Sequence, residues 1–369
     1  MRVRLWLTMM AALLAGGVVC AGESPAVAAH VHDGGVLLFT AADLAARSDL
    51  AADSALKGSD YGVTADVLVS EQRGRLRLLA EALLSSRGGS EIERLQLGWS
   101  VSDSTLLWLG RFHQPASAWN TDHHHGAFLQ TAITRPGIEH WEDENGLLPQ
   151  HLLGALLESR QEVGEHGRGL LLAAGIGAGA VLSEEGLEAV RIIGNPRGGH
   201  KASYSARIAY LPDIAGRSSA GLVLAHNEVA LLPALQAVVG ADTLDVRVLG
   251  AYADLYGERW RLIAVSYGIR SQTDTALAAA THSFVAAYAQ GEFTLSPALT
   301  AFGRLETSAR AAAAPLVQLH PDSFALRRGA VGLRRELGRT NAVSIELSRQ
   351  QTLRDVYGEF RLQWSGVFR

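Results

Sequence analysis

The chain has 369 residues, 48% of them hydrophobic, one Cys and a formal net charge of −4. This charge balance excludes the strongly basic surface typical of nucleic-acid-binding proteins. A single Cys excludes a disulfide framework and any thiolate metal site.

Residues 1–21 have the three parts of a secretory signal peptide. Two Arg lie near the start, an apolar stretch follows, and small residues end at Ala21. Cys20 would allow a lipoprotein signal instead, but Val19 stands where such signals carry a small residue. We therefore expect cleavage near Ala21 and a secreted mature chain without Cys.

Alternating apolar and polar side chains dominate the rest of the chain. Residues 22–58 form an N-terminal segment with a predicted first strand at Gly34 to Thr40, and residues 59–369 form one β domain. Successive strand residues point to opposite faces, so each alternating segment predicts a strand with one apolar side. We count about 16 such segments, joined by Gly, Asp, Asn and Ser turns. The last is the clearest, with four apolar residues on one face: Phe360, Leu362, Trp364 and Phe368.

Two all-β architectures give this pattern, a soluble sandwich or barrel and a membrane barrel with its apolar face outside. Strands of about ten residues match a tilted bilayer crossing, and Trp99 and Trp260 fall towards strand ends. Arg residues occupy the polar side of many strands. A transmembrane antiparallel β-barrel of about 16 strands is therefore favoured, with these Arg in the lumen: Arg75, Arg77, Arg94, Arg111, Arg207, Arg247, Arg304 and Arg361.

One candidate strand does not fit this pattern, because its Arg residues fall on both faces. They are Arg327, Arg328, Arg334 and Arg335. An Arg facing lipid at the bilayer midplane costs about 2–4 kcal/mol. We expect this segment to lie partly outside the membrane or to contain a bulge.

A specialised insertion interrupts the strands between Arg111 and His151. Loops this long are uncommon unless they are functional, so residues 114–147 are predicted to form an internal constriction loop. The insertion concentrates ligand-type, aromatic and charged side chains: His113, Trp119, Asn120, His123, His124, His125, Arg135, Glu139, His140, Trp141, Glu142, Asp143, Glu144 and His151.

The chain resembles the porin-like outer-membrane β-barrels of Gram-negative bacteria. Its insertion resembles a narrower porin-like group over about 42 residues, through motifs that here are Gly110 to His113, Pro115, Trp119-Asn120, His124-His125-Gly126, Gln130-Thr131, Arg135-Pro136, Trp141-Glu142-Asp143, Gly146, Leu148-Pro149 and His151. His123 stands where this group has an aromatic residue, and Asn145 where it has Gly. The resemblance implies an outer-membrane barrel but supplies no substrate.

The first functional hypothesis is a channel for passive, selective diffusion of small hydrophilic solutes. Acidic residues of the insertion would face the Arg residues of the wall, and such rings of charge set selectivity. The acidic residues are Glu139, Glu142, Asp143 and Glu144.

The second hypothesis is a metal-binding or metal-uptake barrel. Imidazole with carboxylate suits zinc, copper, nickel or iron. The candidate ligands are His113, His124, His125, Glu142, Asp143 and His151, although their spacing matches no known metal signature. No other cofactor is expected.

The simplest alternative is that the loop only shapes a pore and binds no particular ligand. His113 and His151 would then bind loop backbone, while Arg135 would clamp the loop through Glu142 or Asp143. A further alternative is that the whole barrel is structural or adhesive and does not conduct. Enzyme activity is not expected, because Gly216 to Gly221 reads GRSSAG and lacks the spacing of a nucleophile elbow. Expected partners are outer-membrane lipid, the barrel assembly machinery through the strand ending at Phe368, a small hydrophilic solute, and further copies of the chain.

Overall fold

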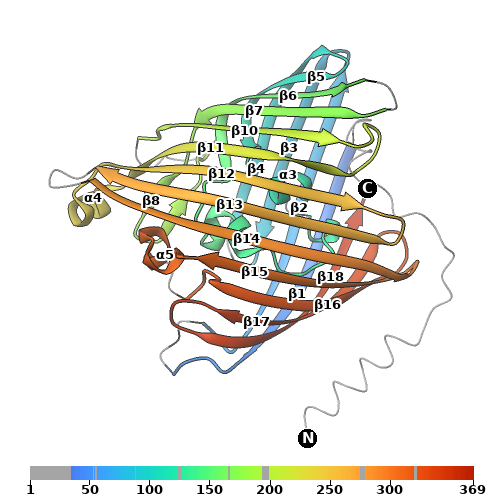
Figure 1. The fold of residues 1–369 in the computed structure, drawn as a ribbon. Coiled ribbons are helices and arrows are strands. Elements are labelled where there is room, and N and C mark those ends of the chain that lie inside the picture. Colours follow the sequence, from blue (N-terminus) through green and yellow to red (C-terminus); the bar gives the residue numbers. More distant parts are fainter. Residues whose placement is uncertain are drawn as a thin grey trace, which may run out of the picture.

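The computed structural model describes residues 35–369 except 53, 55, 88, 124–125, 165–166, 193–198, 275–278 and 320–321. Within these residues, 16 long antiparallel strands form one sheet that closes into a barrel (Figure 1). The strands are β1 (Gly35–Ser48), β2 (Ser59–Arg73), β3 (Leu76–Ser85), β4 (Gly89–Ser102), β5 (Thr105–His113), β6 (His151–Glu162), β7 (Gly169–Ala178), β10 (Ala202–Leu211), β11 (Ser219–Leu231), β12 (Thr243–Tyr256), β13 (Trp260–Asp274), β14 (Ala279–Ser296), β15 (Leu299–Ala309), β16 (Arg327–Glu336), β17 (Asn341–Gln351) and β18 (Val356–Phe368). The predicted all-β barrel is confirmed, and the predicted signal peptide lies outside the described residues.

The first and last strands close the barrel. β1 pairs with β2 on one side and with β18 on the other, with Leu38 opposite Phe368 and Ser48 opposite Gly358. The predicted first strand at Gly34 to Thr40 is thus part of β1, which continues to Ser48 within the barrel wall.

Tight turns and long connections lie at opposite ends of the barrel. At the end where β18 stops, β2 and β3 are joined by Gly74 and Arg75 alone. Gly74 has φ 60°, as the first central residue of a type II′ turn requires, and a side chain there would be strained. At the other end, residues 114–150 carry α3 (Ala118–His123), η2 (Ala127–Leu129), η3 (Gly137–Glu139) and η4 (Glu142–Glu144).

Other connections at this second end carry short elements of their own. They are β8 (Val181–Ser183), β9 (Gly186–Glu188), α4 (Pro233–Val239), η5 (Ala311–Ala313) and α5 (Pro315–Leu319). No helix among the described residues is long and apolar enough to cross a membrane.

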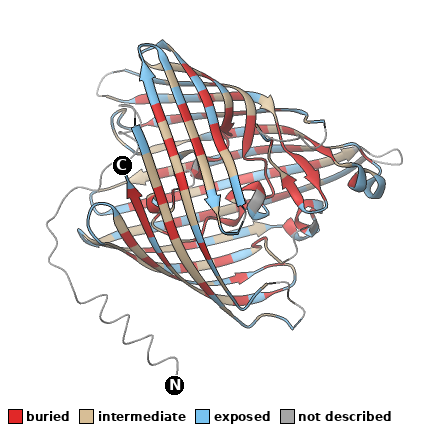
Figure 2. Cartoon of the chain, turned by 180° about the vertical axis from the view of Figure 1, so that it is seen from behind, coloured by how far each residue is buried: buried red, intermediate tan, exposed pale blue. Residues whose placement is uncertain are grey.

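The outer face of the barrel is largely apolar, and buried and exposed residues alternate along the strands (Figure 2). Large hydrophobic side chains are exposed on many strands, among them Leu97, Leu109, Leu222, Leu249 and Leu305. So much exposed apolar surface is unusual on a soluble protein, and lipid would cover it on a membrane barrel.

The inner face of β12 and β13 differs from the prediction, which placed apolar side chains outside and polar ones inside. Val246, Val248, Val265 and Tyr267 point inward and are buried in one hydrophobic cluster with Trp119 of the insertion. The insertion covers this part of the wall, so the inner face here is a packed interior that favours apolar side chains.

The positions of the Arg residues along β16 explain why they fall on both faces of the strand. Arg328 and Arg334 share the inward parity and are buried, whereas Arg327 and Arg335 lie on the outward parity at the strand's two ends. Charge on the outer face costs little near the membrane interfaces. Neither a bulge nor an extramembrane strand is required, contrary to the expectation.

Candidate functional site

The insertion lies inside the barrel and contacts strands all around its wall. Gln114 bonds Asn227 of β11, Glu139 bonds Tyr267 of β13, and η2 packs against β1 and β18. Figure 1 shows α3 within the barrel outline. Residues 114–150 are therefore an internal loop, as the sequence predicted for 114–147, and we call them the internal loop below.

Three wall Arg hold the internal loop by its backbone carbonyls. Arg304 donates to the Thr134 carbonyl at 2.7 Å, Arg334 donates to the Gln130 carbonyl at 2.8 Å, and Arg328 donates to that of Arg135. Buried charge-assisted hydrogen bonds are strong and leave little freedom of orientation. The loop segment from Gln130 to Arg135 is thereby fixed to β15 and β16.

Wall carboxylates hold the same segment by its amides. Glu346 of β17 accepts from the backbone N–H groups of Ile133 at 2.9 Å and Thr134 at 3.1 Å, and Glu306 of β15 accepts from Gly137 N–H at 2.8 Å. The predicted arrangement of loop acids facing wall Arg is thus replaced here by wall acids and wall Arg that both bind loop backbone.

Glu139 is buried where the internal loop meets the inner wall. Its carboxylate accepts from the hydroxyls of Ser117 at 2.5 Å, Tyr267 at 2.6 Å and Tyr288 at 3.0 Å. Burial raises the pKa of Glu139 above its usual value, and these hydroxyl donors only partly oppose the rise.

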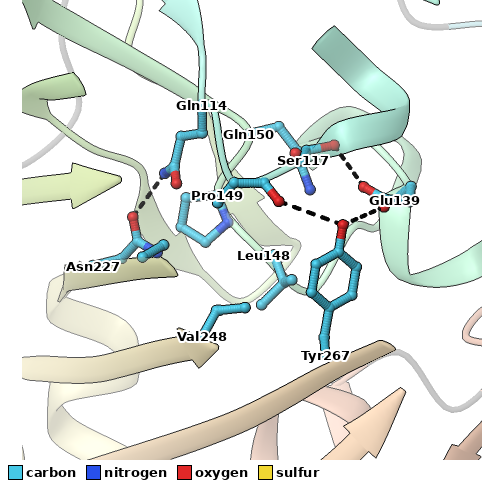
Figure 3. Close-up of a pocket in the computed structure, with 11 residues that line it drawn as sticks. Gln114, Ser117, Glu139, Leu148, Pro149, Gln150, Asn227, Val248 and Tyr267 are labelled. Carbon is cyan, nitrogen blue, oxygen red and sulfur yellow. Dashed lines mark hydrogen bonds between the residues drawn. The ribbon is translucent and has the colours of Figure 1, made fainter. Parts of the chain in front are cut away.

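Beside Glu139, a small cavity of about 10 Å³ lies between the loop and β11–β13, and Figure 3 shows its lining. This is close to the space that one water molecule needs. The contact between the loop and this wall is therefore close-packed, with no room for a solute among the side chains in Figure 3.

A buried ligand-type cluster sits where the internal loop leaves and rejoins the wall. His113 ends β5, His151 begins β6, and the two residues are opposite each other in the strand register. His151 Nε2 lies 3.0 Å from a Glu93 oxygen of β4, and its Nδ1 lies 2.9 Å from Glu142. One ligand atom from each of Glu93, His113 and His151 lies within 4.8 Å of the other two.

Glu142 also organises the return of the loop into β6. One of its oxygens accepts from the backbone N–H groups of Gln150 at 2.6 Å and His151 at 3.0 Å. Burial alone would raise the pKa of Glu142, but attraction to His151 and these hydrogen bonds lower it overall. Glu142 therefore binds His151, whereas the Asp143 side chain, the other predicted clamp partner of Arg135, lies outside the described residues.

Trp141 covers this cluster from the loop side. Its ring stacks on His151 at 5.0 Å between centroids and lies 4.8 Å from the His113 ring. The Arg135 guanidinium lies over the Trp141 ring, 4.3 Å from its centroid, and 3.6 Å from a Glu144 oxygen. The alternation of exposed and buried residues along β5 stops at Arg111, and the cluster is closed to solvent.

Several other predicted residues also point into the barrel. Arg94 pairs with Glu81, and Arg207 contacts Thr121 of the loop at 2.9 Å. Arg111 instead shares the outward parity of Leu109, although it is buried against Glu91 at 2.6 Å. Arg77 has the inward parity of β3 and is half-buried.

Two loop residues that the sequence singled out are buried in α3. Trp119 stacks on His123 at 4.5 Å, and Asn120 donates to the Glu139 carbonyl at 2.9 Å.

Two further predicted lumen Arg also lie elsewhere. Arg247 alternates with the buried Val246 and Val248, so it is on the outer face, where it pairs with Asp245 at 2.8 Å. Arg75 is exposed in the tight turn after β2. Alternation reveals that two faces differ but not which face is inside, and that is why Arg247 was misplaced. His124 and His125 lie outside the described residues, as does the side chain of Asp143.

One row of inward charges is left partly uncovered by the internal loop. Asp43 of β1 shares its parity with Phe39, which is buried in one hydrophobic cluster with Phe128 of the loop. Asp43 lies 2.8 Å from Arg87 and 3.7 Å from Arg361 of β18. The side chains of Arg87 and Arg361 are 37% and 21% exposed, against 0% for the loop-binding Arg304.

Sequence reasoning missed the wall residues that hold the loop and complete the cluster. They are Glu93, Glu306, Glu346, Tyr267, Arg328 and Arg334, together with Glu292, which accepts from the hydroxyl of the loop's Thr131 at 2.8 Å. The two Arg carried a signal, because charge on both parities of one strand had marked β16 as unusual. Glu93 carried none, since it lies in a β-bulge far from the insertion in sequence.

Comparison with solved structures identifies the fold. An anion-selective porin from Comamonas acidovorans is 15% identical, with 91% of this chain and 100% of that chain covered and a TM-score of 0.57. OmpF of Salmonella typhi in complex with daunomycin is 11% identical, with 91% and 97% covered and a TM-score of 0.57. OmpT, an outer membrane protein of Vibrio cholerae, is 8% identical, with 91% and 98% covered and a TM-score of 0.54.

Comparisons with protein-family models and with curated proteins gave no match. The structural likenesses confirm the porin-like fold that the sequence predicted.

Proposed function

We propose that the protein is an outer-membrane channel for the passive, selective diffusion of small hydrophilic solutes. Support comes from a closed barrel with an apolar outer face and one long loop held inside it. The structurally similar proteins named above include an anion-selective porin. The protein would act without catalysis, with lipid around the barrel and solute within it.

The observation that carries the proposal is the partly exposed charged row on β1, β18 and the turn after β3. The internal loop packs against β11–β14 and binds β15–β17, whereas Asp43, Arg87 and Arg361 keep contact with solvent. Charges of both signs at a constriction attract and orient small polar solutes and set ion selectivity. Glu142, by contrast, is buried against His151, so its neutralisation is not expected to act directly on passing ions.

Single-channel recording of the purified protein in planar bilayers tests this assignment. Arg361→Gln removes a partly exposed positive charge, so we expect its reversal potential in a salt gradient to shift towards cation selectivity. Asp43→Asn should shift it in the opposite direction. Arg247→Gln is the matched control, because it removes the same charge from the outer face.

These recordings can support the channel or exclude it. Opposite shifts for Arg361→Gln and Asp43→Asn, with Arg247→Gln unchanged, would place the conducting path along the charged row. A folded, inserted protein that gives no conductance steps would exclude the channel and leave a structural or adhesive barrel.

The remaining partners belong to the same proposal. The strand ending at Phe368 would be recognised by the barrel assembly machinery, and further copies of the chain would form an oligomer. One structurally similar protein, OmpT of Vibrio cholerae, is described in a trimer form. Crosslinking of the protein in native outer membranes would reveal both kinds of contact.

A further inference from the structure

We propose that Glu93, His113 and His151 form a binding site for a divalent transition-metal ion of the zinc type. The site ties the two ends of the internal loop to β4. It does not depend on whether the barrel conducts, and it differs from the ligand set that the sequence suggested by including Glu93.

The donor set has the chemistry and spacing of such a site. Two imidazole nitrogens and one carboxylate oxygen lie within 4.8 Å of one another, and all three residues are buried. Zinc binds imidazole and carboxylate at about 2.0–2.2 Å, so ligand atoms around one ion lie roughly 3–3.5 Å apart. The 3.0 Å between the Glu93 oxygen and His151 Nε2 already matches this spacing. The His113 nitrogen lies within 4.8 Å of both atoms and would have to move closer to them to bind the same ion.

Glu142 supplies the orienting contact that metal-bound His residues usually have. The Glu142 carboxylate lies 2.9 Å from His151 Nδ1 and binds this nitrogen of the ring. The other ring nitrogen, Nε2, therefore points at Glu93. A carboxylate on the far nitrogen fixes the ring and makes the ligand more basic. Glu142 is thus a positioning residue, not a ligand.

The charge around the cluster also favours a cation. Arg111 lies 3.8 Å from Glu93, but its nearer partner is Glu91 at 2.6 Å. Glu93, Glu142 and Glu91 therefore face one Arg and His151, so that even a protonated His151 leaves these three carboxylates one positive charge short. Buried charges need compensation, and a divalent ion would supply it.

The position of the ligands defines what the ion would do. His113 and His151 are the residues from which the internal loop departs and to which it returns, and Glu93 belongs to the neighbouring strand. One ion would therefore staple both ends of the loop to β4. Trp141, stacked on His151, would close over it, so loading requires a movement of the loop at Trp141.

The test is metal binding by the full-length folded barrel in detergent, stripped with a chelator and titrated with Zn²⁺, then with Co²⁺ as a spectroscopic probe. We expect one Zn²⁺ per chain and visible Co²⁺ absorption typical of a Co²⁺ ion bound by nitrogen and oxygen ligands. Glu142→Gln should weaken binding about 10–100-fold, as loss of an outer-shell partner does. Glu93→Gln, His113→Phe and His151→Ala should each weaken it at least as much.

Matched controls separate this site from other His residues. His226→Ala removes an outward-facing His that pairs with Asp245, and it should bind Zn²⁺ normally. His113→Phe keeps an aromatic ring against Trp141, and heat-dependent gel migration verifies that each variant is folded. Zn²⁺ should also slow proteolysis of the internal loop in the native protein but not in His113→Phe.

Three results would overturn the proposal. The first is that the folded native protein does not bind Zn²⁺. The second is that the Glu93, His113 and His151 variants bind Zn²⁺ as tightly as the native protein does. The third is that only the His124→Ala/His125→Ala variant loses Zn²⁺ binding. The first would leave His151 as a proton-bridged partner of Glu93 and Glu142.

Discussion

Glu139 shows how one buried carboxylate joins the internal loop to the wall. Its three hydroxyl donors come from the loop itself and from two different strands, β13 and β14. A neutral, protonated Glu139 could keep these contacts without the cost of burying a charge. The loop is thereby made sensitive to the protonation state of one side chain.

We expect Glu139→Gln to remove part of the pH dependence of stability. Because the folded-state pKa of Glu139 lies above its usual 4.5, the stability due to its protonated form is complete below pH 4.5 and is lost as pH rises through the folded pKa. The unfolding temperature of Glu139→Gln should equal that of the native protein at low pH and exceed it increasingly above pH 4.5. Circular dichroism in detergent measures this, with the exposed Glu144→Gln as control, and parallel curves would contradict it.

Individual residues of the cluster were predictable from sequence only where they lie close together in the chain. His113, His151 and Glu142 were proposed as neighbours because one insertion carries them all. Glu93 lies on another strand and approaches His151 only through the register of β4 and the bulge before Arg94. A single sequence contains no information about such long-range pairings.

At the scale of elements, the internal loop is held by the β15–β17 wall more than by its own secondary structure. Its helices are at most six residues long, too short to be stable alone. Buried side chains of β15, β16 and β17 instead satisfy the backbone groups of residues 130–137. The loop thus keeps one course through the lumen because the wall accepts and donates its hydrogen bonds.

Glu346→Ala should release this segment of the loop. It removes the acceptor of two backbone N–H groups and of the Thr134 hydroxyl, and each donor left without a partner costs about 1–3 kcal/mol. We expect faster proteolysis between residues 130 and 137 and larger, noisier conductance steps. The control is Arg349→Ala, because Arg349 lies on β17 as Glu346 does but forms only an exposed pair with Asp49. Conductance and proteolysis identical to those of the native protein would show that the loop is held elsewhere.

The existence of the loop could be predicted from its length and composition, but its course could not. Which wall it covers depends on contacts such as Arg304 to Thr134, which join residues 170 positions apart. That course also decides where apolar side chains face inward, as Val246 and Tyr267 do. The prediction of a polar inner face was wrong on β12 and β13 for this reason.

At the scale of the whole molecule, the barrel was predictable because alternation repeats in nearly every strand. Approximate strand number follows from counting such segments, whereas closure depends on β1, whose Ala-rich sequence carries weak alternation. The structure places β1 against β18 over eleven residue pairs, from Leu38↔Phe368 to Ser48↔Gly358. This pairing removes the free edges that would otherwise expose unpaired backbone groups.

Paired cysteines test this closure in a mature chain that is expected to have none of its own. Ala41 and Ser365 are opposite each other and both buried on the inner face, so Ala41→Cys/Ser365→Cys should form a disulfide across β1 and β18. The oxidised, heat-denatured chain would then be a covalent loop with altered gel mobility, reversed by reductant. Ala41→Cys/Gly366→Cys is the control, because neighbouring residues point to opposite faces and its sulfurs cannot meet. Crosslinking in the control but not in the first pair would mean that β1 and β18 pair in a different register. The inner face of β1, including Asp43, would then be misassigned.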